Sequence, residues 1–231
     1  MKERTFSKSS GLMLAIAAVL FWVAWVLMPG VGVTDSREIF RLVGSHRPQV
    51  MVSVIVQLLS AVLYVPAMLG MVTDPRLTSI RGVRLWAGVV VIGAMGSAAD
   101  AVLHLLAFAM TAPTVDTAAS IPVMEFMQGP GLWLLAPLIA SFFVGGVALA
   151  VSLVRARLIS SGILWLYVAG LAVGVLGGLL ASQGIVSSRF VGLTVLGAVS
   201  LAQALVGLRI GLYGTRGLPT DQFIKTKGEQ S

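Results

Sequence analysis

Long apolar runs separated by short polar segments dominate this chain. Six of the runs are long enough, or nearly so, to cross a hydrocarbon core of roughly 30 Å as helices. They are Gly11–Met28, Val50–Val72, Leu85–Ala112, Leu132–Val154, Ile163–Ala181 and Val191–Leu208. The pattern therefore predicts an all-α, polytopic membrane protein, a bundle of six transmembrane helices.

Composition strengthens this prediction. Hydrophobic residues make up 57% of the 231 residues and charged residues 11%, whereas a soluble domain carries about 25% charged residues. We expect an N-terminal cytoplasmic segment (1–10), a transmembrane domain (11–212) and a polar, disordered cytoplasmic tail (213–231). The first run lacks a small-residue cleavage site, so we interpret it as a retained span and not as a signal peptide.

The placement of charge predicts the topology. The net charge is +7, but the basic residues flank the apolar runs and form no patch, so no nucleic-acid partner is expected. Only Arg37, Arg41, Arg47 and Arg189 fall on one side of the six predicted helices, and the other twelve Lys and Arg residues fall on the opposite side. Because cytoplasmic segments carry the excess of Lys and Arg, the prediction is N-in/C-in, with both termini cytoplasmic in a cell membrane of the bacterial inner-membrane type.

This topology assigns interfaces to the aromatic residues. It places Trp22, Trp25 and Trp133 near the outer interface and Trp86, Trp165 and Tyr167 near the inner one. Such belts are typical of membrane proteins, because amphipathic rings are stable at headgroup depth.

Two outer segments carry local signals. Asp35 and Glu38 resemble a capping box and Gly44 a C-cap, which predicts a short helix on the outer surface. The segment from Pro113 to Gly131 is interpreted as a loop that contains Glu125 and Gln128. Glu125 is either at the outer rim of the bundle or in water, and the sequence leaves both positions open.

Glycines at intervals of four predict close helix packing. Gly170, Gly174 and Gly178 share a face of the fifth span, and Gly207 and Gly211 end the sixth. Small residues at this spacing let helix backbones approach each other. The row in the fifth span serves either internal packing or a homodimer.

The third span contains a pair of ionisable residues in its middle. Asp100 and His104 are the only charged or titratable side chains between Leu85 and Ala112. A charge at that depth costs about 2.5–3.5 kcal/mol on insertion scales. A spacing of four puts both on one helical face, where a partner, water or a ligand has to offset the cost.

The second span offers partners for this pair. Ser53, Gln57, Ser60 and Tyr64 form a polar stripe along one helical face. Counting at 1.5 Å per residue from the outer ends places Gln57 and Ser60 at about the depth of the pair, in the outer half of the membrane. We therefore expect Gln57 and Ser60 to hydrogen-bond Asp100 and His104.

Four functions are compatible with such a cluster. The first is binding of a small apolar or lipid-like molecule, and the second is acid–base catalysis on an apolar substrate by an isomerase, cyclase or hydrolase. The third is an accessory subunit whose cluster only fixes helix packing, and the fourth is a component of proton-coupled transport. Candidate ligand-binding residues are Gln57, Ser60, Tyr64, Asp100, His104 and Gln128, and candidate catalytic residues are Asp100, His104 and Glu125.

The sequence predicts no metal and no cofactor. It contains no cysteine and two histidines, which leaves too few ligands for a zinc site without Glu125. No lysine lies inside a span, so a retinal Schiff base is excluded. Nucleotide-binding, nucleophile-elbow and metalloprotease motifs are absent as well. Expected partners are membrane lipid and a small apolar molecule.

Two short sequence segments, together with the number of spans, resemble those of a known family. The second span ends in Ala61–Tyr64 before a basic loop, and Ser152–Leu164 is followed by Val168–Gly170. With the six spans, these features resemble the uncharacterised bacterial membrane proteins of domain-of-unknown-function family 4386. The similarity covers roughly residues 11–210, and Ser160–Ser161 replaces the family's aromatic-rich turn. The resemblance implies the architecture alone, because the family has no assigned chemistry.

Overall fold

The computed structural model is an all-α bundle and describes residues 2–213, with side chains described for residues 8–212. The predicted tail lies outside the described residues, apart from Tyr213 at the end of the last helix. Six helical stretches are long and apolar enough to span a membrane. The helices are α1 (Lys2–Leu27), α2 (Ser36–Ser45), α3 (Arg47–Thr73), α4 (Pro75–Thr78), α5 (Val83–Met110), α6 (Thr117–Phe126), α7 (Leu132–Arg155), α8 (Ser161–Ser182) and α9 (Ser188–Tyr213).

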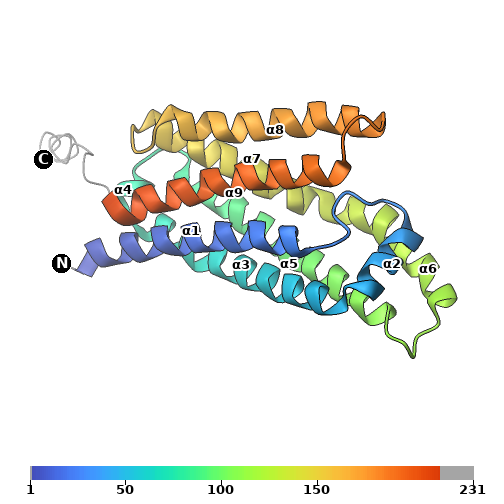
Figure 1. The fold of residues 1–231 in the computed structure, drawn as a ribbon. Coiled ribbons are helices and arrows are strands. Elements are labelled where there is room, and N and C mark those ends of the chain that lie inside the picture. Colours follow the sequence, from blue (N-terminus) through green and yellow to red (C-terminus); the bar gives the residue numbers. More distant parts are fainter. Residues whose placement is uncertain (1, 214–231) are drawn as a thin grey trace, which may run out of the picture.

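The long helices lie roughly side by side, with α4 at one end and α2 and α6 at the other (Figure 1). We call these the α4 end and the α2/α6 end. The extensive contacts follow the order α7, α5, α3, α1, α9, α8, whereas α7 and α8 touch only slightly. The bundle is therefore a curved row of helices that closes weakly between α7 and α8.

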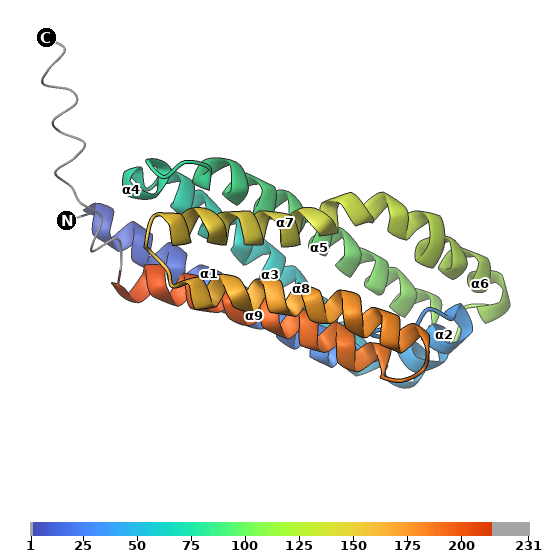
Figure 2. The ribbon, with the colours of Figure 1, turned by 90° about the horizontal axis from the view of Figure 1, so that it is seen from above.

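The fourth span is longer than predicted. One π-helical turn, η1 (Met127–Gly131), joins α6 to α7. The combined helix therefore runs without a break from Thr117 to Arg155, over 39 residues. The prediction of a loop from Pro113 to Gly131 is wrong for most of its length. Asp116 starts α6 by accepting a hydrogen bond from the Ala118 N–H at 2.9 Å, and Pro130 lies inside the π-helical turn. Figure 2 shows α6 continuing α7 past the end of its neighbours.

Helix α2 begins as the sequence predicts and ends later. The Asp35 carboxylate accepts from the Glu38 N–H at 2.7 Å, which is the N-cap. Glu38 does not complete the capping box, because its carboxylate pairs with Arg41. That ion pair lowers the pKa of Glu38 below its usual value, chiefly through the hydrogen bond. The expected C-cap at Gly44 is wrong, since the helix continues to Ser45 and His46 caps it.

Small residues set the closest helix crossings. A Cβ on Gly207 of α9 would lie 2.5 Å from the Gly11 carbonyl oxygen of α1, so only glycine permits this approach. In α8, Gly170 and Gly174 face Ala198 and Val195 of α9, whereas Gly178 has open space around it. The first two glycines therefore serve packing within the chain, and a homodimer through the row remains a prediction.

Two arginines at the α2/α6 end cap helix C-termini. Arg47 donates to the Phe108 carbonyl at 2.7 Å, and its guanidinium lies 4.0 Å from the centre of the Phe108 ring, at the end of α5. Arg189 donates to the Met28 and Pro29 carbonyls just beyond α1. Cations are stabilising there, because the last carbonyls of a helix lack partners and carry partial negative charge.

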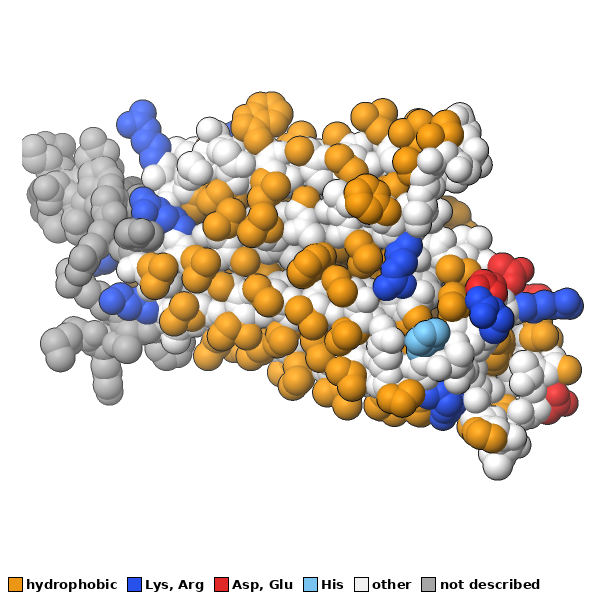
Figure 3. All heavy atoms as spheres, viewed as in Figure 1, with side chains coloured by type: hydrophobic (Ala, Val, Ile, Leu, Met, Phe, Trp, Pro, Cys, Tyr) orange, Lys and Arg blue, Asp and Glu red, His pale blue; other side chains and the backbone are white. Residues whose placement is uncertain are grey.

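Hydrophobic side chains spread along the middle of the bundle on the face drawn in Figure 3, and acidic side chains cluster at the α2/α6 end. This is the surface expected of a chain surrounded by lipid. Trp133 and Trp165 are exposed, as interface residues require, but Tyr167 is buried and Trp25 is half-buried. The side chains of Trp25 and Tyr167 therefore pack inside the bundle, and the interface depth of these aromatic residues remains a prediction.

Candidate functional site

Gln57 of α3 links the two ionisable residues of α5. Its amide nitrogen donates to Asp100 Oδ2 at 2.9 Å and to the Ser97 carbonyl at 3.2 Å. Its amide oxygen lies 3.2 Å from His104 Nδ1. Asp100 Oδ2 and His104 Nδ1 are themselves 3.8 Å apart. The predicted contact between Gln57 and the pair is confirmed.

This geometry determines the histidine tautomer. The Ser97 carbonyl oxygen and the Asp100 carboxylate oxygen both accept hydrogen bonds, so the NH2 group of the Gln57 amide has to point toward them. The amide oxygen of Gln57 therefore faces His104. The Nδ1 of His104 must then carry a hydrogen, because a carbonyl oxygen cannot donate. Nε2 has no hydrogen-bond partner among the described residues, which leaves it as the nitrogen that accepts or carries a proton.

The rest of the polar stripe on α3 makes other contacts. Ser60 donates to the Ala17 carbonyl at 2.8 Å and Ser53 to the Ala24 carbonyl at 2.7 Å, so both bond to α1. The expectation that Ser60 would bond to the Asp100–His104 pair is wrong. Three residues turn a helix by about 300°, so Ser60 points about 60° away from Gln57 and meets a different neighbour.

Tyr64 belongs to a second buried cluster. Its hydroxyl donates to the Gln203 side-chain oxygen on α9, and the Tyr167 side chain from α8 lies beside Gln203. All three residues are almost completely buried. A void of about 10 Å³ beside Tyr167 and Gln203 holds at most a single water. Tyr64 therefore packs helices together and is separate from the Asp100 site.

A cavity of about 190 Å³ borders the Asp100–His104 pair at the α2/α6 end. Residues from α1, α2, α3, α5, α6, η1 and α7 line it, so α2 and α6 form its roof. The lining is mostly apolar: Trp25, Met28, Val31, Val33, Ile39, Val43, Val50, Leu103, Ala107, Met124, Met127 and Leu132, with glycines 30 and 32 and the polar residues Asp100, His104 and Gln128. Pockets of this kind, apolar with a few convergent polar groups, are typical of ligand sites.

Three polar groups beside this cavity lack protein partners in the described part of the chain. They are the second carboxylate oxygen of Asp100, Nε2 of His104 and the buried indole N–H of Trp25. The Trp25 ring lies edge-on to the His104 ring, with 5.6 Å between centroids. Of the three groups, only the Trp25 N–H is fully buried, and an unpaired buried polar group costs free energy. The site therefore favours an occupant that accepts from Trp25 and has groups complementary to Asp100 and His104.

The two candidates from the segment before α7 differ in position. Gln128 is exposed but lines the cavity. Glu125 is exposed on α6 and is absent from the lining. The structure thus brings Gln57, Asp100, His104 and Gln128 together and leaves out Ser60, Tyr64 and Glu125.

Sequence reasoning missed the apolar part of the site. Trp25, Met28, Met124 and Met127 line the cavity, yet nothing in their local pattern separates them from core residues. The one available signal was the run around Met124 and Met127, too apolar for a solvated loop. Among the described residues, no group of three or more His, Asp or Glu side chains is placed to hold a metal ion.

Comparisons of the chain with protein-family models, curated proteins and solved structures gave no match. The fold defines the class, a membrane protein with six apolar helices, and the function has to be argued from the geometry of the cavity.

Proposed function

We propose that this protein binds a small, largely apolar molecule with a basic or hydrogen-bond-donating group in the cavity at Asp100. The observation that carries the proposal is the cavity itself: an apolar space of about 190 Å³ beside a carboxylate. An apolar cavity of about 150 Å³ accommodates benzene, and sites for drug-sized ligands start near 300 Å³. The size therefore favours a molecule of one ring or a short chain and disfavours a whole lipid.

The charge of the cavity lining favours a ligand that carries a hydrogen-bond donor or a positive charge. No Lys or Arg lines the cavity, so only a protonated His104 or the ligand can balance the negative charge of Asp100. Gln57 holds one carboxylate oxygen by a hydrogen bond and leaves the other available. An amine would satisfy that oxygen, while its apolar body would contact Met28, Met124 and Met127, whose side chains adapt to different shapes.

The proposed orientation places the cavity in the outer half of a cell membrane, with both termini cytoplasmic. The capping arginines support it. At the α2/α6 end, Arg47 and Arg189 bond helix carbonyls and Arg41 pairs with Glu38. At the α4 end, Arg81 and Arg155 have no protein partner among the described residues. The positive-inside rule puts the end with the excess of Lys and Arg residues, here the α4 end, in the cytoplasm.

One observation favours acid–base catalysis as a second candidate. The tautomer fixed by Gln57 leaves Nε2 of His104 without a protein partner, which is the arrangement a general base requires. Glu125 gives no support, because its side chain is exposed outside the lining. An isomerase with a single base fits the site better than a reaction that needs two carboxylates.

Benzylamine and benzyl alcohol test the binding proposal as matched probes. We expect benzylamine to raise the thermal midpoint of the purified chain in a saturable way, because a ligand that binds only the folded state stabilises it by RT ln(1 + [L]/Kd). Benzyl alcohol should have a smaller effect. Asp100→Asn should abolish most of the benzylamine shift, whereas Glu125→Gln, which removes an exposed carboxylate at the same end, should keep it.

Two results would contradict the proposal. One is the absence of a saturable shift in the wild-type chain, which would make the cavity a structural void. The other is an equal shift in Asp100→Asn and Glu125→Gln, which would place the amine elsewhere.

A further inference from the structure

A second, larger hollow lies at the opposite end of the bundle, between α5, α7 and α8. Its volume is about 1360 Å³, well beyond the range of about 300–1,000 Å³ usual for small-molecule pockets. It occupies the side on which α7 and α8 scarcely touch. The groove is independent of the cavity at Asp100 and shares no lining residue with it.

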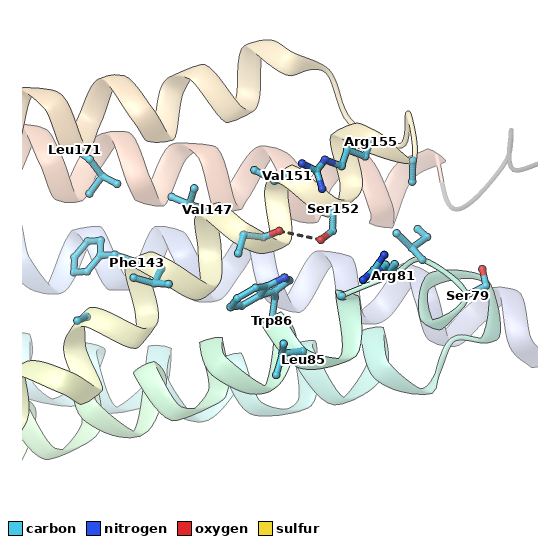
Figure 4. A pocket seen from close by; sticks show the side chains of 16 residues that line it. Ser79, Arg81, Leu85, Trp86, Phe143, Val147, Val151, Ser152, Arg155 and Leu171 are labelled. Atoms are coloured by element: carbon cyan, nitrogen blue, oxygen red, sulfur yellow. Dashed lines mark hydrogen bonds between the residues drawn. The ribbon is translucent and has the colours of Figure 1, made fainter.

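The groove has one basic end and one apolar end. Figure 4 shows Arg81 and Arg155 toward the α4 end and Phe143 and Leu171 toward the middle of the bundle. Both arginines are exposed and have no hydrogen-bond or ion-pair partner among the described residues. No Asp or Glu side chain lines the groove. Its mouth therefore carries two uncompensated positive charges.

One further donor, the Trp86 indole N–H, lies in the groove with the two arginines. Gly82, which precedes α5, has φ of +90°, and a Cβ there would lie 3.0 Å from Trp86 Nε1 and 3.2 Å from Ser152 Oγ. The indole N–H of Trp86 has no partner among the described residues. Ser152 donates to the Ala148 carbonyl at 3.0 Å and so still accepts. An indole beside basic residues is typical of headgroup depth in membranes.

The apolar part of the groove opens sideways from the bundle. Leu85 and Val144 are 61% and 56% exposed and line it together with Phe143, Val147 and Leu171. Both α5 and α7 belong to candidate membrane spans, so this surface faces acyl chains and not water. A hydrocarbon chain that enters from the side contacts Val147 while its headgroup stays at the end of the helices.

We propose that this groove binds an anionic phospholipid of the surrounding membrane. Arg81 and Arg155 hold the phosphate and its negative headgroup, Trp86 donates to a headgroup oxygen, and an acyl chain lies along Phe143, Val147 and Leu171. A guanidinium suits phosphate because it offers several donors in one plane. Charge complementarity selects an anionic lipid over a zwitterionic one, since each Arg near the membrane surface favours anionic lipids about fivefold.

Native mass spectrometry of the full chain tests this proposal, with phosphatidylglycerol and phosphatidylcholine of identical acyl chains as probes. We expect the wild-type chain to retain phosphatidylglycerol at least about tenfold better. Arg81→Gln with Arg155→Gln should bring the preference to within about twofold of unity, and Lys at both positions should restore most of it. The matched control, Arg37→Gln with Arg84→Gln, changes two exposed arginines outside the groove and should keep the preference.

A second arm separates a lipid from a free phosphate. Ala140→Trp fills the apolar part of the groove and should lower retention of both lipids several-fold, whereas Ala169→Trp, an exposed alanine of α8 outside the lining, should not. Soluble glycerol phosphate in excess should fail to displace the lipid. Displacement by glycerol phosphate would indicate a phosphate site and would overturn the proposal.

Other outcomes also count against it. Equal retention of the two lipids by the wild-type chain would show that the arginines do not select charge. Unchanged preference after loss of both arginines would place the lipid elsewhere. A second copy of the chain over the groove, detected as a lipid-free dimer that Ala140→Trp dissociates, would replace the lipid as occupant.

Discussion

Gln57 lets a carboxylate persist inside an apolar helix bundle. Its amide donates to Asp100 and accepts from His104, so one uncharged side chain satisfies part of both. A hydrogen bond to a charged group contributes roughly 1.5–3 kcal/mol, and leaving a buried group unpaired costs about 1–3 kcal/mol. The pair in α5 therefore depends on a residue that is 43 positions away from Asp100 in the sequence.

Replacing that amide should be costly. Gln57→Leu removes the donor to Asp100 and the acceptor for His104, and we expect it to lower the free energy of unfolding by about 1–3 kcal/mol. Gln128→Leu makes the same chemical change at an exposed position and should stay within about 0.5 kcal/mol. Reversible unfolding in mixed detergent measures both variants. Equal effects would mean that the contact of Gln57 with Asp100 contributes nothing.

The sequence allows part of this site to be predicted, and the reason is geometric. Depth counting placed Gln57 at about the depth of the Asp100–His104 pair because helical rise is regular, and the structure confirms the contact of Gln57 with both residues. The same count assigned Ser60 to the pair, which is wrong. Depth in the membrane does not give the direction of a side chain around the helix axis. Ser60 is offset by about 60° from Gln57 around the axis and therefore contacts α1. The cavity lining could not be predicted at all, because a residue such as Trp25 looks like core or interface in any local pattern.

At the scale of elements, the apolar runs predict the six spans, but they do not predict α6, which forms part of the roof of the cavity. Helix α6 was missed because Pro122, Gly129 and Pro130 read as loop residues. Tertiary contacts and the π-turn at η1 keep this segment helical. The Asp35 cap of α2 was predictable because it is a local hydrogen bond. Local signals thus define where helices start, and packing decides how far they continue.

The α1–α9 crossing provides a test of packing. Gly207→Leu would force a side chain into the Gly11 backbone, so we expect a loss of at least about 2 kcal/mol or failure to accumulate in the membrane. Gly178→Leu is the matched control, since nothing lies within 4 Å of a Cβ there. Expression and thermal stability of the two variants report the difference. A destabilised Gly178→Leu would instead reveal a contact of that face with another chain.

At the scale of the whole molecule, the orientation can be measured directly because the chain contains no cysteine. Thr117 at the start of α6 and Ser160 before α8 are exposed at opposite ends. We expect Thr117→Cys to react with a membrane-impermeant maleimide in intact cells and Ser160→Cys to react only after lysis. The reverse pattern would invert the topology and place the cavity at Asp100 toward the cytoplasm.

The unbroken helix from α6 through η1 to α7 connects the two proposed sites. Met124 and Gln128 line the cavity near one end of it, and Val147 and Arg155 line the groove near the other. If binding at either place shifts this helix, linkage requires that each occupant alter the affinity of the other by the same factor. Membrane composition would then act as an effector of ligand binding at Asp100.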